Sequence, residues 1–399
     1  MAETADSPDS NRVASDVSTI PAVAGDAQGP LESPGALPTV LIAHDFAETY
    51  GGAERIIATA AAVLPGTPLW AIAGRQSVAE RMGVGDRFHT VLPRSETLLR
   101  HYRRLAPAYP AIVRLRPLPD ADVLLTSSYA FAHGFRTRNR APQVCYCYSP
   151  LRFLWSMTGE YGDRVAGGAA RRRVFDAVVR MMRRADQRAS SRVTRYVAES
   201  RHVAQQIRRA YGRDSEVIHP PVDCDRFRPG HEAGHDGYFL FCGRLVEPYK
   251  RPGLVIEAFR GLPWRLVVAG DGPNYPELKE RATGNVEFLG HVDDADLVPL
   301  MQRCAASVFP SVDDFGLIPV ETMACGRPVL AFAGGGALET VKAGETGEFF
   351  DQPTVDALRT AVERFDPDAY DSAAIRAHAE RWHLPRFQEA ILRTIQAVA

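Results

Sequence analysis

Short apolar runs alternate with helix-forming segments from residue 38 onward, and they predict the elements of the first half of the chain. The run at 38–45 predicts a buried strand, which a Gly51-Gly52 turn connects to a helix at 55–64. Alternation of this kind is typical of a parallel sheet with helical crossovers. The other segments predicted in this half are strands at 69–72, 122–127, 143–148 and 195–198 and an arginine-rich helix at 171–189.

The second half of the chain repeats the pattern, with a helical composition at 252–259. Its predicted strands are 238–242, 265–269, 286–289, 305–309 and 328–332. The pattern therefore predicts an α/β protein with two Rossmann-like, doubly wound domains in tandem. In such sheets ligands bind beyond the carboxyl ends of the strands, where the glycine-rich turns of this chain fall.

A length of 399 residues agrees with two domains, because a single hydrophobic core rarely grows beyond about 300 residues. We expect an N-terminal domain at 38–199, a C-terminal domain at 200–380 and a terminal helical segment at 381–399. Residues 1–37 are rich in Ala, Ser, Pro, Asp and Gly, and they are predicted to form a disordered tail. No apolar run reaches the roughly 20 residues that span a bilayer, and no leader pattern opens the chain, so we expect a cytoplasmic protein.

Charge is unevenly distributed, although the net charge is only −1. Residues 38–199 carry 24 arginines against 13 acidic residues, while residues 200–399 carry 22 basic against 29 acidic residues. The first domain is therefore basic and the second acidic, which favours different partners for each.

The six cysteines show no CxxC spacing, and most of them have apolar neighbours. Cys145 and Cys147 alternate along a predicted strand, so their thiols are expected on one face of it. We therefore predict buried free thiols and no metal site.

The segment 313–326 is the most informative part of the chain. It places Asp313 and Glu321 eight positions apart around a Phe-Gly-Leu turn that indicates the start of a helix. Unpaired backbone N–H groups and a partial positive charge at a helix start suit phosphate or sugar oxygens. The two carboxylates can accept hydrogen bonds from hydroxyl groups, so the segment indicates a nucleotide-sugar site.

Two further features follow predicted strands. Gly51 and Gly52 open a helix, so their amides could approach a phosphate closely, with a plain tight turn as the alternative. Arg244 and Lys250 follow the strand at 238–242, and Lys250 is one of only three lysines against 44 arginines. Such a basic pair could neutralise a diphosphate leaving group, with a solvated surface pair as the alternative.

These features resemble, in order and spacing, the family 4 retaining nucleotide-sugar glycosyltransferases, which have the GT-B fold. The resemblance covers residues 38 to 395 and implies two Rossmann-like domains facing across a cleft. It also implies that the final helix, within 385–399, crosses back onto the first domain. The segments that carry it, besides those above, are 243–244, 269–273, 324–329 and 334–341.

The resemblance implies roles for four residues, which form the predicted catalytic set. Arg244 and Lys250 would bind the donor diphosphate. Glu321 would hydrogen-bond the nucleotide ribose, and Asp313 would contact the sugar hydroxyls. In that family the first acidic residue of this pair is usually glutamate. Asp313 is shorter by one methylene, so its contact with the sugar departs from the family pattern.

Backbone amides supply the other implied donor contacts. Those around Phe315, Gly316 and Leu317 would hold the sugar and phosphate. Gly51 and Gly52 would reach the donor from the opposite domain. Because the family works without a bound metal, no cofactor is expected, and Arg, Lys and helix dipoles would take the place of a cation.

The acceptor side departs from related bacterial mannosyl- and rhamnosyltransferases. Tyr148 stands where those proteins carry the histidine of a His-Thr-Pro segment, and Arg152 follows it in the chain. A tyrosine donates a hydrogen bond but does not take up a proton near neutral pH as histidine does. His44 and His133 follow other strand ends and are further acceptor-side candidates, with a structural histidine as the alternative.

Arginine and aromatic residues gather at 98–119 and 171–195, and the second segment holds nine arginines. Such surfaces suit anionic lipid headgroups, with about 1 kcal/mol of attraction per basic side chain. A solvated helix face is the alternative for the second segment, and no nucleic-acid motif accompanies either of them. We expect peripheral contact with the inner face of the plasma membrane, which a lipid-linked acceptor would require.

The chain is therefore predicted to be a retaining, metal-independent hexosyltransferase. It would move a hexose, with mannose from GDP-mannose favoured, from a nucleotide sugar to a hydroxyl of a glycan or glycolipid. One alternative is a catalytically silent nucleotide-sugar-binding subunit of a glycan-assembly complex, which the departures at Asp313 and Tyr148 motivate. The other is a GT-B sugar-nucleotide epimerase.

Overall fold

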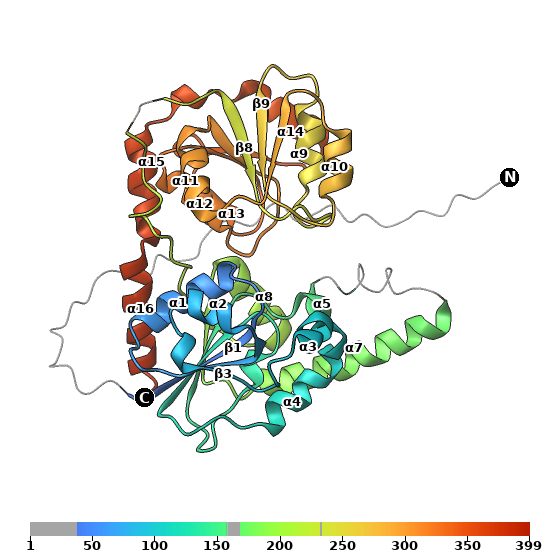
Figure 1. Cartoon of the computed structure of the whole chain (residues 1–399), viewed down its shortest axis with the longest axis vertical. Coiled ribbons are helices and arrows are strands. Elements are labelled where there is room, and N and C mark those ends of the chain that lie inside the picture. The colour runs from blue at the N-terminus through green and yellow to red at the C-terminus, as the bar shows by residue number, and fades with distance from the viewer. Residues whose placement is uncertain (1–37, 157, 159–167, 232–233) are drawn as a thin grey trace. The chain divides into compact units, whose positions relative to one another are not determined.

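The computed structural model describes residues 38–156, 158, 168–231 and 234–399 (Figure 1). The predicted disordered tail at 1–37 lies outside them. Within the described residues the strands form two parallel sheets, one of seven strands and one of six. The predicted α/β fold with two doubly wound domains is confirmed.

The first sheet has the strand order β3-β2-β1-β4-β5-β6-β7, and all neighbouring strands pair in parallel. Its inner strand β1 is buried at every position, as expected for a strand covered on both faces. The strands are β1 (Val40–Ala47), β2 (Leu69–Gly74), β3 (Phe88–Thr90), β4 (Val123–Ser128), β5 (Gln143–Cys147), β6 (Arg195–Ala198) and β7 (Ser215–Val217).

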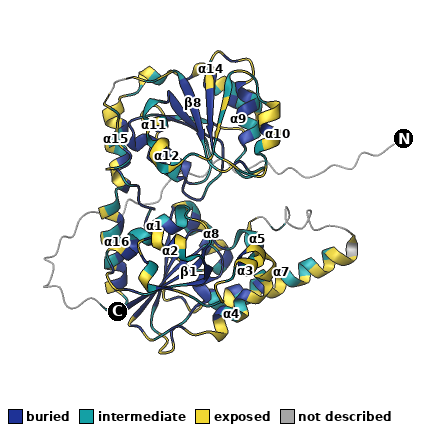
Figure 2. Ribbon diagram, in the orientation of Figure 1, coloured by how far each residue is buried: buried dark blue, intermediate teal, exposed yellow. Residues whose placement is uncertain are grey.

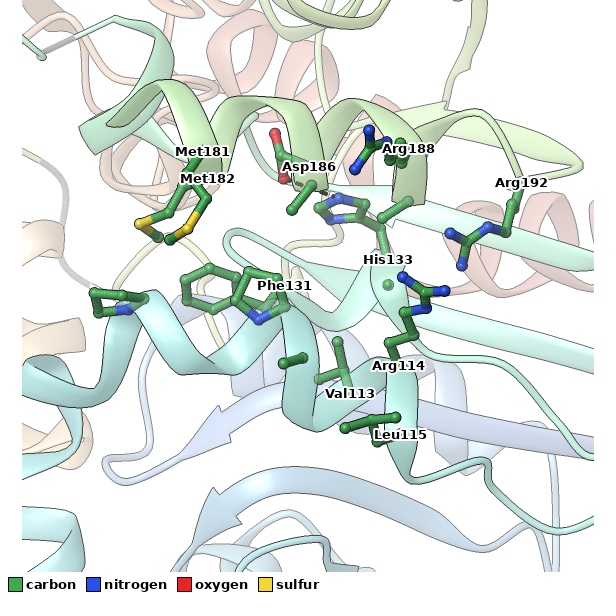
Figure 3. Close-up of a pocket in the computed structure, with 16 residues that line it drawn as sticks. Val113, Arg114, Leu115, Phe131, His133, Met181, Met182, Asp186, Arg188 and Arg192 are labelled. Carbon is green, nitrogen blue, oxygen red and sulfur yellow. Dashed lines mark ion pairs between the residues drawn. The ribbon is translucent and has the colours of Figure 1, made fainter. Parts of the chain in front are cut away.

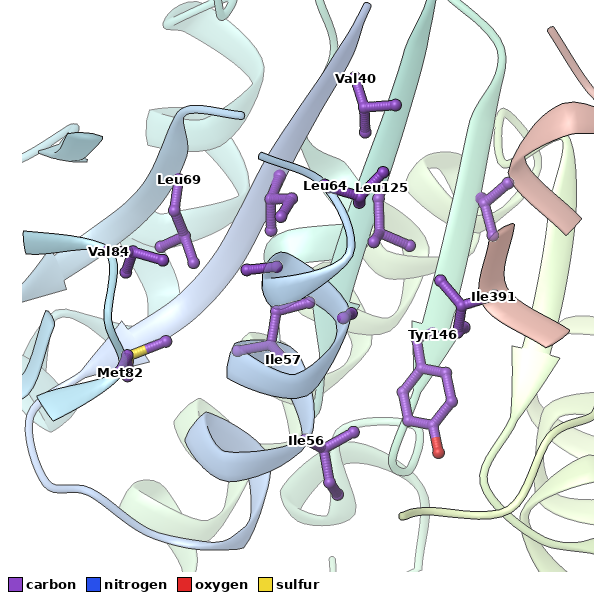
Figure 4. Close-up of a cluster of buried hydrophobic side chains, with 14 of the residues drawn as sticks. Val40, Ile56, Ile57, Leu64, Leu69, Met82, Val84, Leu125, Tyr146 and Ile391 are labelled. Atoms are coloured by element: carbon purple, nitrogen blue, oxygen red, sulfur yellow. The ribbon is translucent and has the colours of Figure 1, made fainter. Parts of the chain in front are cut away.

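Helices cover both faces of the first sheet. Helix α1 (Gly52–Ala62) packs on one face together with the C-terminal helix α16 (Leu384–Gln396), and their side chains share an apolar cluster with β4 and β5 (Figure 4). Helices α4 (Tyr109–Leu115) and α7 (Ala169–Ser190) and the 3₁₀ helix η2 (Tyr102–Ala108) cover the other face. The remaining elements of this domain are α2 (Gln76–Arg81), η1 (Gly85–Arg87), α3 (Glu96–His101), η3 (Ala132–Gly134), α5 (Arg152–Trp155) and α8 (Arg201–Tyr211).

The first sheet extends beyond the predicted domain boundary at residue 199. Helix α8 and strand β7 follow β6, and β7 pairs with β6 in parallel. The boundary therefore lies after Val217 and not at 199. Strand β7 is the three-residue segment Ser-Glu-Val, too short and too polar to leave a hydrophobic pattern. Strand β1 also continues past the predicted end at 45 to Ala47.

The second sheet has the order β10-β9-β8-β11-β12-β13 and is again parallel throughout. Its strands are β8 (Tyr238–Cys242), β9 (Arg265–Ala269), β10 (Val286–Gly290), β11 (Ala306–Phe309), β12 (Val329–Phe332) and β13 (Gly347–Phe350). Its helices are α9 (Pro252–Phe259), α10 (Tyr275–Arg281), α11 (Asp294–Arg303), α12 (Leu317–Ala324), α13 (Ala337–Thr340), α14 (Val355–Arg364) and α15 (Ser372–Ala379). The 3₁₀ helix η4 (Pro367–Ala369) precedes α15, and η5 (Glu380–Trp382) follows it.

The chain passes between the two domains twice, once after β7 and once before α16. The Val222 N–H donates to the Trp382 carbonyl at 2.8 Å, and Val222 pairs with His383 in an isolated parallel bridge. The two passages are thus bonded to each other. Beyond them, Phe387 and Ile391 of α16 enter the apolar cluster of the first domain.

Strand order reverses once in each sheet, between β1 and β4 in the first and between β8 and β11 in the second. The strands themselves are largely buried, whereas the outer faces of α7 and α10 are exposed (Figure 2). Ligands of doubly wound sheets bind where the order reverses, beyond the carboxyl ends of the strands. The loops after these strands are therefore the expected ligand site.

Candidate functional site

A cavity of about 610 Å³ is lined by loops from both switch points. The loops after β4, β5 and β6 contribute from the first domain, and those after β8 and β11 from the second. A volume of this size is usual for a small-molecule site. The predicted site residues that line it are Gly52, Tyr148, Arg152, Lys250, Asp313, Phe315, Gly316, Leu317 and Glu321.

The first turns of two helices meet at this cavity. Gly52 opens α1 and Leu317 opens α12, and a Cβ on Gly52 would lie 3.2 Å from Leu317 Cδ1. Each first turn carries backbone N–H groups that have no partner within the helix, together with the positive end of the helix dipole. Two such ends beside one cavity suit a diphosphate.

Gly334, Gly335 and Gly336 pack closely against the loop that follows β11. The Gly336 N–H donates to the Asp313 carbonyl at 2.9 Å, and a Cβ on Gly336 would lie only 2.3 Å from the Phe315 backbone. No other residue type fits that approach. The glycine segment at 334–336 therefore positions the backbone that carries Asp313.

Each of the two predicted acids pairs with a cation through one oxygen and leaves the other unused. Asp313 pairs with Lys250, and Glu321 pairs with Arg55. Asp313 Oδ1 and Glu321 Oε2 are buried and have no hydrogen-bond partner within the part of the chain that the structure describes. Leaving a buried acceptor unpaired costs about 1–3 kcal/mol, so these oxygens are suited to accept hydrogen bonds from ligand hydroxyls.

In each pair the partner's charge favours the ionised form of one member, Asp313 or Arg55. Burial acts to raise the pKa of Asp313, but the neighbouring Lys250 outweighs it and holds the pKa below the usual value. The charge of Glu321 raises the pKa of Arg55 against the opposing effect of burial. The cavity therefore presents two carboxylates with free acceptor oxygens beside two fixed cations.

Asp314 links the two domains at the edge of the cavity. Its carboxylate pairs with Arg152 and accepts from Gln206 Nε2 at 2.9 Å, while its carbonyl accepts from Ser200 Oγ at 2.5 Å. Arg152 also lies over the ring of Tyr249, 4.6 Å from the ring centroid. The charge of Arg152, a predicted acceptor-side residue, is thus already matched by Asp314.

Four predicted site residues do not line the cavity. Arg244 is exposed on the loop after β8, and the Gly51 N–H is taken by the Glu54 carboxylate at 2.9 Å. His44 is fully buried behind the cavity, and His133 is buried with Asp186 on the side of the sheet that α7 covers.

A chain of hydrogen bonds connects His44 to the cavity through Tyr148. The Tyr148 hydroxyl donates to the Ala53 carbonyl at 3.0 Å and contacts Ser127 Oγ at 2.8 Å, and Ser127 Oγ contacts His44 Nδ1 at 2.9 Å. Because the single hydroxyl proton of Tyr148 goes to Ala53, Ser127 must donate to Tyr148, and His44 Nδ1–H must donate to Ser127. Burial raises the pKa of Tyr148 well above its usual value, so its hydroxyl stays neutral.

At its His44 end, this chain of hydrogen bonds continues through Glu54 to the Gly51-Gly52 turn. His44 Nε2 lies 3.3 Å from Glu54 Oε1, and the other oxygen of Glu54 accepts from the Gly51 N–H. With Nδ1 already a donor, a bond at Nε2 requires one further proton, on His44 or on Glu54. Tyr148 thus lines the cavity, and together with His44 it positions the N-terminus of α1.

His133 belongs to a separate buried pair. Its Nε2 lies 3.0 Å from Asp186 Oδ1, and Trp155 Nε1 donates to Asp186 Oδ2 at 2.7 Å. Figure 3 shows the pair within a pocket of about 340 Å³ between α4 and α7. Burial opposes the charged form of His133, yet Asp186 raises its pKa to about 9. The imidazolium is therefore held for structure, away from the cavity.

Arg55 and Glu199 are among the lining residues that were not predicted from the sequence. Arg55 lies in the first turn of α1, and its position just after Gly51-Gly52 was the available signal. Glu199 directly follows β6, so the same attention to strand ends that singled out His44 would have found it. Burial, together with the charges of Asp314 and Asp313, raises the pKa of Glu199 well above its usual value against the effect of Arg152.

The cysteines are free, and all but Cys242 are buried. Among residues 38–156, 158, 168–231 and 234–399, no three His, Cys, Asp or Glu side chains are grouped so as to hold a metal ion. In the same ranges, none of the helices has the length and apolar character needed to traverse a bilayer.

Two family models match nearly the whole described chain. Residues 50–226 match the model described as Glycosyltransferase Family 4, and residues 225–382 match the one described as Glycosyl transferases group 1. The two matches meet close to the observed domain boundary.

Curated relatives are similar over about half of the chain. The GDP-mannose-dependent alpha-(1-6)-phosphatidylinositol monomannoside mannosyltransferase of Mycolicibacterium smegmatis is 31% identical over 220 residues, covering 47% of this chain and 57% of the relative. The D-inositol 3-phosphate glycosyltransferase of Mycobacterium tuberculosis is 32% identical over 187 residues, covering 41% of this chain and 38% of the relative. The chain thus matches less than two thirds of the length of either relative.

Solved structures share the fold over most of the chain. Anabaena Alr3699/HepE in complex with UDP and glucose has a TM-score of 0.66 at 19% identity, covering 90% of this chain and 100% of that one. Sucrose-phosphate synthase (tll1590) from Thermosynechococcus elongatus has a TM-score of 0.64 at 17% identity with the same coverage. At these identities the likeness shows the fold alone.

Proposed function

The chain belongs to the family 4 glycosyltransferases with the GT-B fold, and from this premise we propose that it transfers a hexose from a nucleoside diphosphate sugar to a hydroxyl group. The observation that carries the proposal is the pair of buried, unused oxygens on Asp313 and Glu321 beside two helix N-termini. Within one cavity they offer carboxylate oxygens that accept hydrogen bonds from hydroxyl groups and backbone N–H groups that donate hydrogen bonds to a diphosphate.

The roles follow from this arrangement. Lys250 and the first turns of α1 and α12 stabilise the diphosphate as it leaves, with Arg244 reaching in from its exposed position when the donor is bound. Glu321 Oε2 accepts from the nucleotide ribose, and Asp313 Oδ1 accepts from the sugar. The shorter side chain of Asp313 is directed by its ion pair with Lys250.

Catalysis in this proposal depends on position more than on proton transfer. The acceptor hydroxyl attacks from the face that the diphosphate leaves, so the configuration is retained, and the departing phosphate oxygen takes the proton. Fixed cations and helix dipoles supply the positive charge, without a metal ion. Arg55 stays paired with Glu321 and fixes the carboxylate that faces the ribose.

The favoured donor is GDP-mannose and the favoured acceptor a glycan or glycolipid. The Mycolicibacterium smegmatis relative supports both, since its name gives GDP-mannose as donor and a phosphatidylinositol mannoside as acceptor. The basic face of the first domain supports membrane contact, because Val174 and Met181 of α7 are 64% and 54% exposed among its arginines. Apolar and cationic side chains together suit an anionic membrane surface.

A panel of nucleotide sugars tests the donor assignment. The correct donor at about 100 times its Kd should stabilise the protein by roughly 2.7 kcal/mol, seen as a rise in melting temperature. Release of the nucleoside diphosphate should then require an added glycolipid or glycan acceptor. If no nucleotide sugar shifts the melting temperature, the proposal is overturned.

Two outcomes would favour the alternatives. Binding of a nucleotide sugar without any release of the nucleoside diphosphate, with or without acceptor, would indicate a silent binding subunit. Interconversion of the donor sugar without acceptor, followed by NMR, would indicate an epimerase.

A further inference from the structure

The cavity of about 610 Å³ described above is called the nucleotide-sugar cavity from here on, after its proposed ligand. A second cavity, of about 890 Å³, adjoins it within the first domain. Tyr129, Leu151 and Phe153 line both cavities, so the two lie side by side at these side chains. The second cavity lies between η2 and the first half of α7, and it is called the α7 groove below. None of the functional roles proposed above uses it.

The walls of the α7 groove are aromatic and aliphatic. Phe46, Tyr109 and Phe131 form its floor, with ring centroids 5.1–5.3 Å apart from one to the next. Val174 and Phe175 of α7 form its rim, and Val174 is 64% exposed. An exposed apolar groove of this kind is a usual mark of a binding site.

The polar atoms of these walls are already used by the protein. The Tyr109 hydroxyl donates to the Tyr102 carbonyl at 2.8 Å, and the Tyr129 hydroxyl donates to the Phe46 carbonyl at 3.4 Å. The floor therefore offers a ligand apolar surface and few hydrogen-bond partners. A hydrocarbon chain fits such walls, whereas a sugar or a polypeptide backbone would lose its own hydrogen bonds to water.

Positive charge lies next to the apolar walls. Arg103 and Arg171 line the α7 groove. An acceptor with an anionic linker between its sugar and its hydrocarbon chain would place that linker near these guanidinium groups.

We propose that the α7 groove holds the hydrocarbon chain of an amphipathic acceptor whose reacting hydroxyl enters the nucleotide-sugar cavity past Tyr129. This inference rests on the proposed glycosyl transfer and narrows its acceptor to lipid-linked glycosides. The adjacency of the two cavities carries it, because a hydrocarbon chain in the groove brings its attached sugar to the edge of the nucleotide-sugar cavity. The exposed Val174 marks the side on which the chain leaves toward a membrane.

Alkyl α-mannosides with methyl, hexyl, octyl and decyl chains, each below its critical micelle concentration, test the inference by calorimetric binding. Binding should tighten about fourfold for each methylene that enters the groove. Val174→Asp places a charge at the rim and should remove this dependence on chain length. Val174→Trp should weaken the decyl compound by filling the groove without adding charge.

Leu115→Asp is the matched control, because Leu115 is 73% exposed on the same face of the domain but does not line the α7 groove. It should keep the chain-length dependence of the wild-type protein. Equal affinity for all four mannosides, or equal loss in the Leu115 and Val174 variants, would overturn the inference.

The same samples separate this inference from the proposed function. Stabilisation by a nucleotide sugar should persist in the Val174 variants, since Val174 does not line the nucleotide-sugar cavity. If donor binding and transfer to a water-soluble acceptor survive while chain length has no effect, the groove is excluded and the transferase stands. If no nucleotide sugar binds at all, the proposed function fails first.

Discussion

Two sets of ion pairs in this protein use the same chemistry in opposite ways. In the nucleotide-sugar cavity, Lys250 and Arg55 are 23% and 26% exposed, and each partner carboxylate keeps one oxygen unused. Behind the first sheet, His133 and Asp186 are 5% and 3% exposed, and both oxygens of Asp186 are engaged. The carboxylates of the first set each keep one oxygen for a ligand, whereas each oxygen of Asp186 already faces a protein partner.

The difference shows how a functional carboxylate can be told from a structural one. A buried pair that satisfies all of its acceptors contributes to folding and offers nothing to a ligand. A buried carboxylate oxygen without a hydrogen bond lowers the free energy of unfolding, and a ligand hydroxyl that donates a hydrogen bond to it removes this loss. The predictions below test this contrast.

Lys250→Ala should give the largest effect. Without its charge, the leaving diphosphate loses a fixed cation, and donor turnover should fall about a hundredfold to a thousandfold. Steady-state release of nucleoside diphosphate measures this. Lys342→Ala is the matched control, because Lys342 pairs with Glu345 on the surface at 3.1 Å. Turnover that equals the wild-type value would remove Lys250 from the site.

Asp186→Asn should destabilise the protein by about 3 kcal/mol while leaving nucleotide-sugar binding intact, because it leaves His133 without its counter-charge. Urea unfolding measures the change. Asp176→Asn on the same helix is the control, since Asp176 pairs with Arg172 in an exposed position and should cost little.

The pH dependence of the same pair has a definite sign. The pKa of His133 is raised to about 9, so the folded protein binds a proton that the unfolded chain releases near its ordinary value of about 6.5. Its contribution is full below pH 6 and is lost as the pH rises through 9. Asp186→Asn should abolish this loss, and an unchanged pH profile in the variant would contradict the assignment.

Tyr148→Phe should lower turnover about tenfold with a smaller change in stability. The variant loses the bond to the Ala53 carbonyl and leaves Ser127 without its acceptor, which loosens the first turn of α1. Tyr146→Phe, in the strand β5 that Tyr148 follows, is the control, because its hydroxyl donates to the Ile218 carbonyl and Tyr146 does not line the cavity. Equal turnover in the two variants would argue against a positioning role.

Glu199→Gln should have the smallest effect, a rise in melting temperature of about 2–4 °C at pH 8. Because the pKa of Glu199 is raised in the folded state, the folded protein keeps a proton that the unfolded chain loses, and stability falls as the pH rises above about 4.3. Glutamine removes that penalty, so the gain should vanish at pH 4. Glu216→Gln, at an exposed site on β7, should show no such gain.

Local patterns were sufficient to predict most of the fold. Buried parallel strands such as β1 and β8 leave continuous apolar runs, and the turns after them are marked by glycine. Strand β7 could not be predicted in this way, because it is held by pairing with β6 and not by its own composition.

The candidate site was predictable only where its residues stand close together in the chain. Asp313 and Glu321 share one helix start, so their spacing pointed to a ligand. Their partners do not share it, because Arg55 is 266 residues from Glu321 and meets it only once both sheets are formed. The separation of His133 from the cavity likewise depends on which face of the first sheet α7 covers.

The bonded passages between the domains decide how this protein can be recombined. Helix α16 follows the second domain in sequence but completes the core of the first. A second domain exchanged by a single cut after Val217 would therefore bring a foreign α16 with it. A functional chimera requires two cuts, one near Val222 and one near His383, where the passages meet. The second domain is therefore exchanged as an insert between two junctions in the first domain, and not as the C-terminal half of the chain.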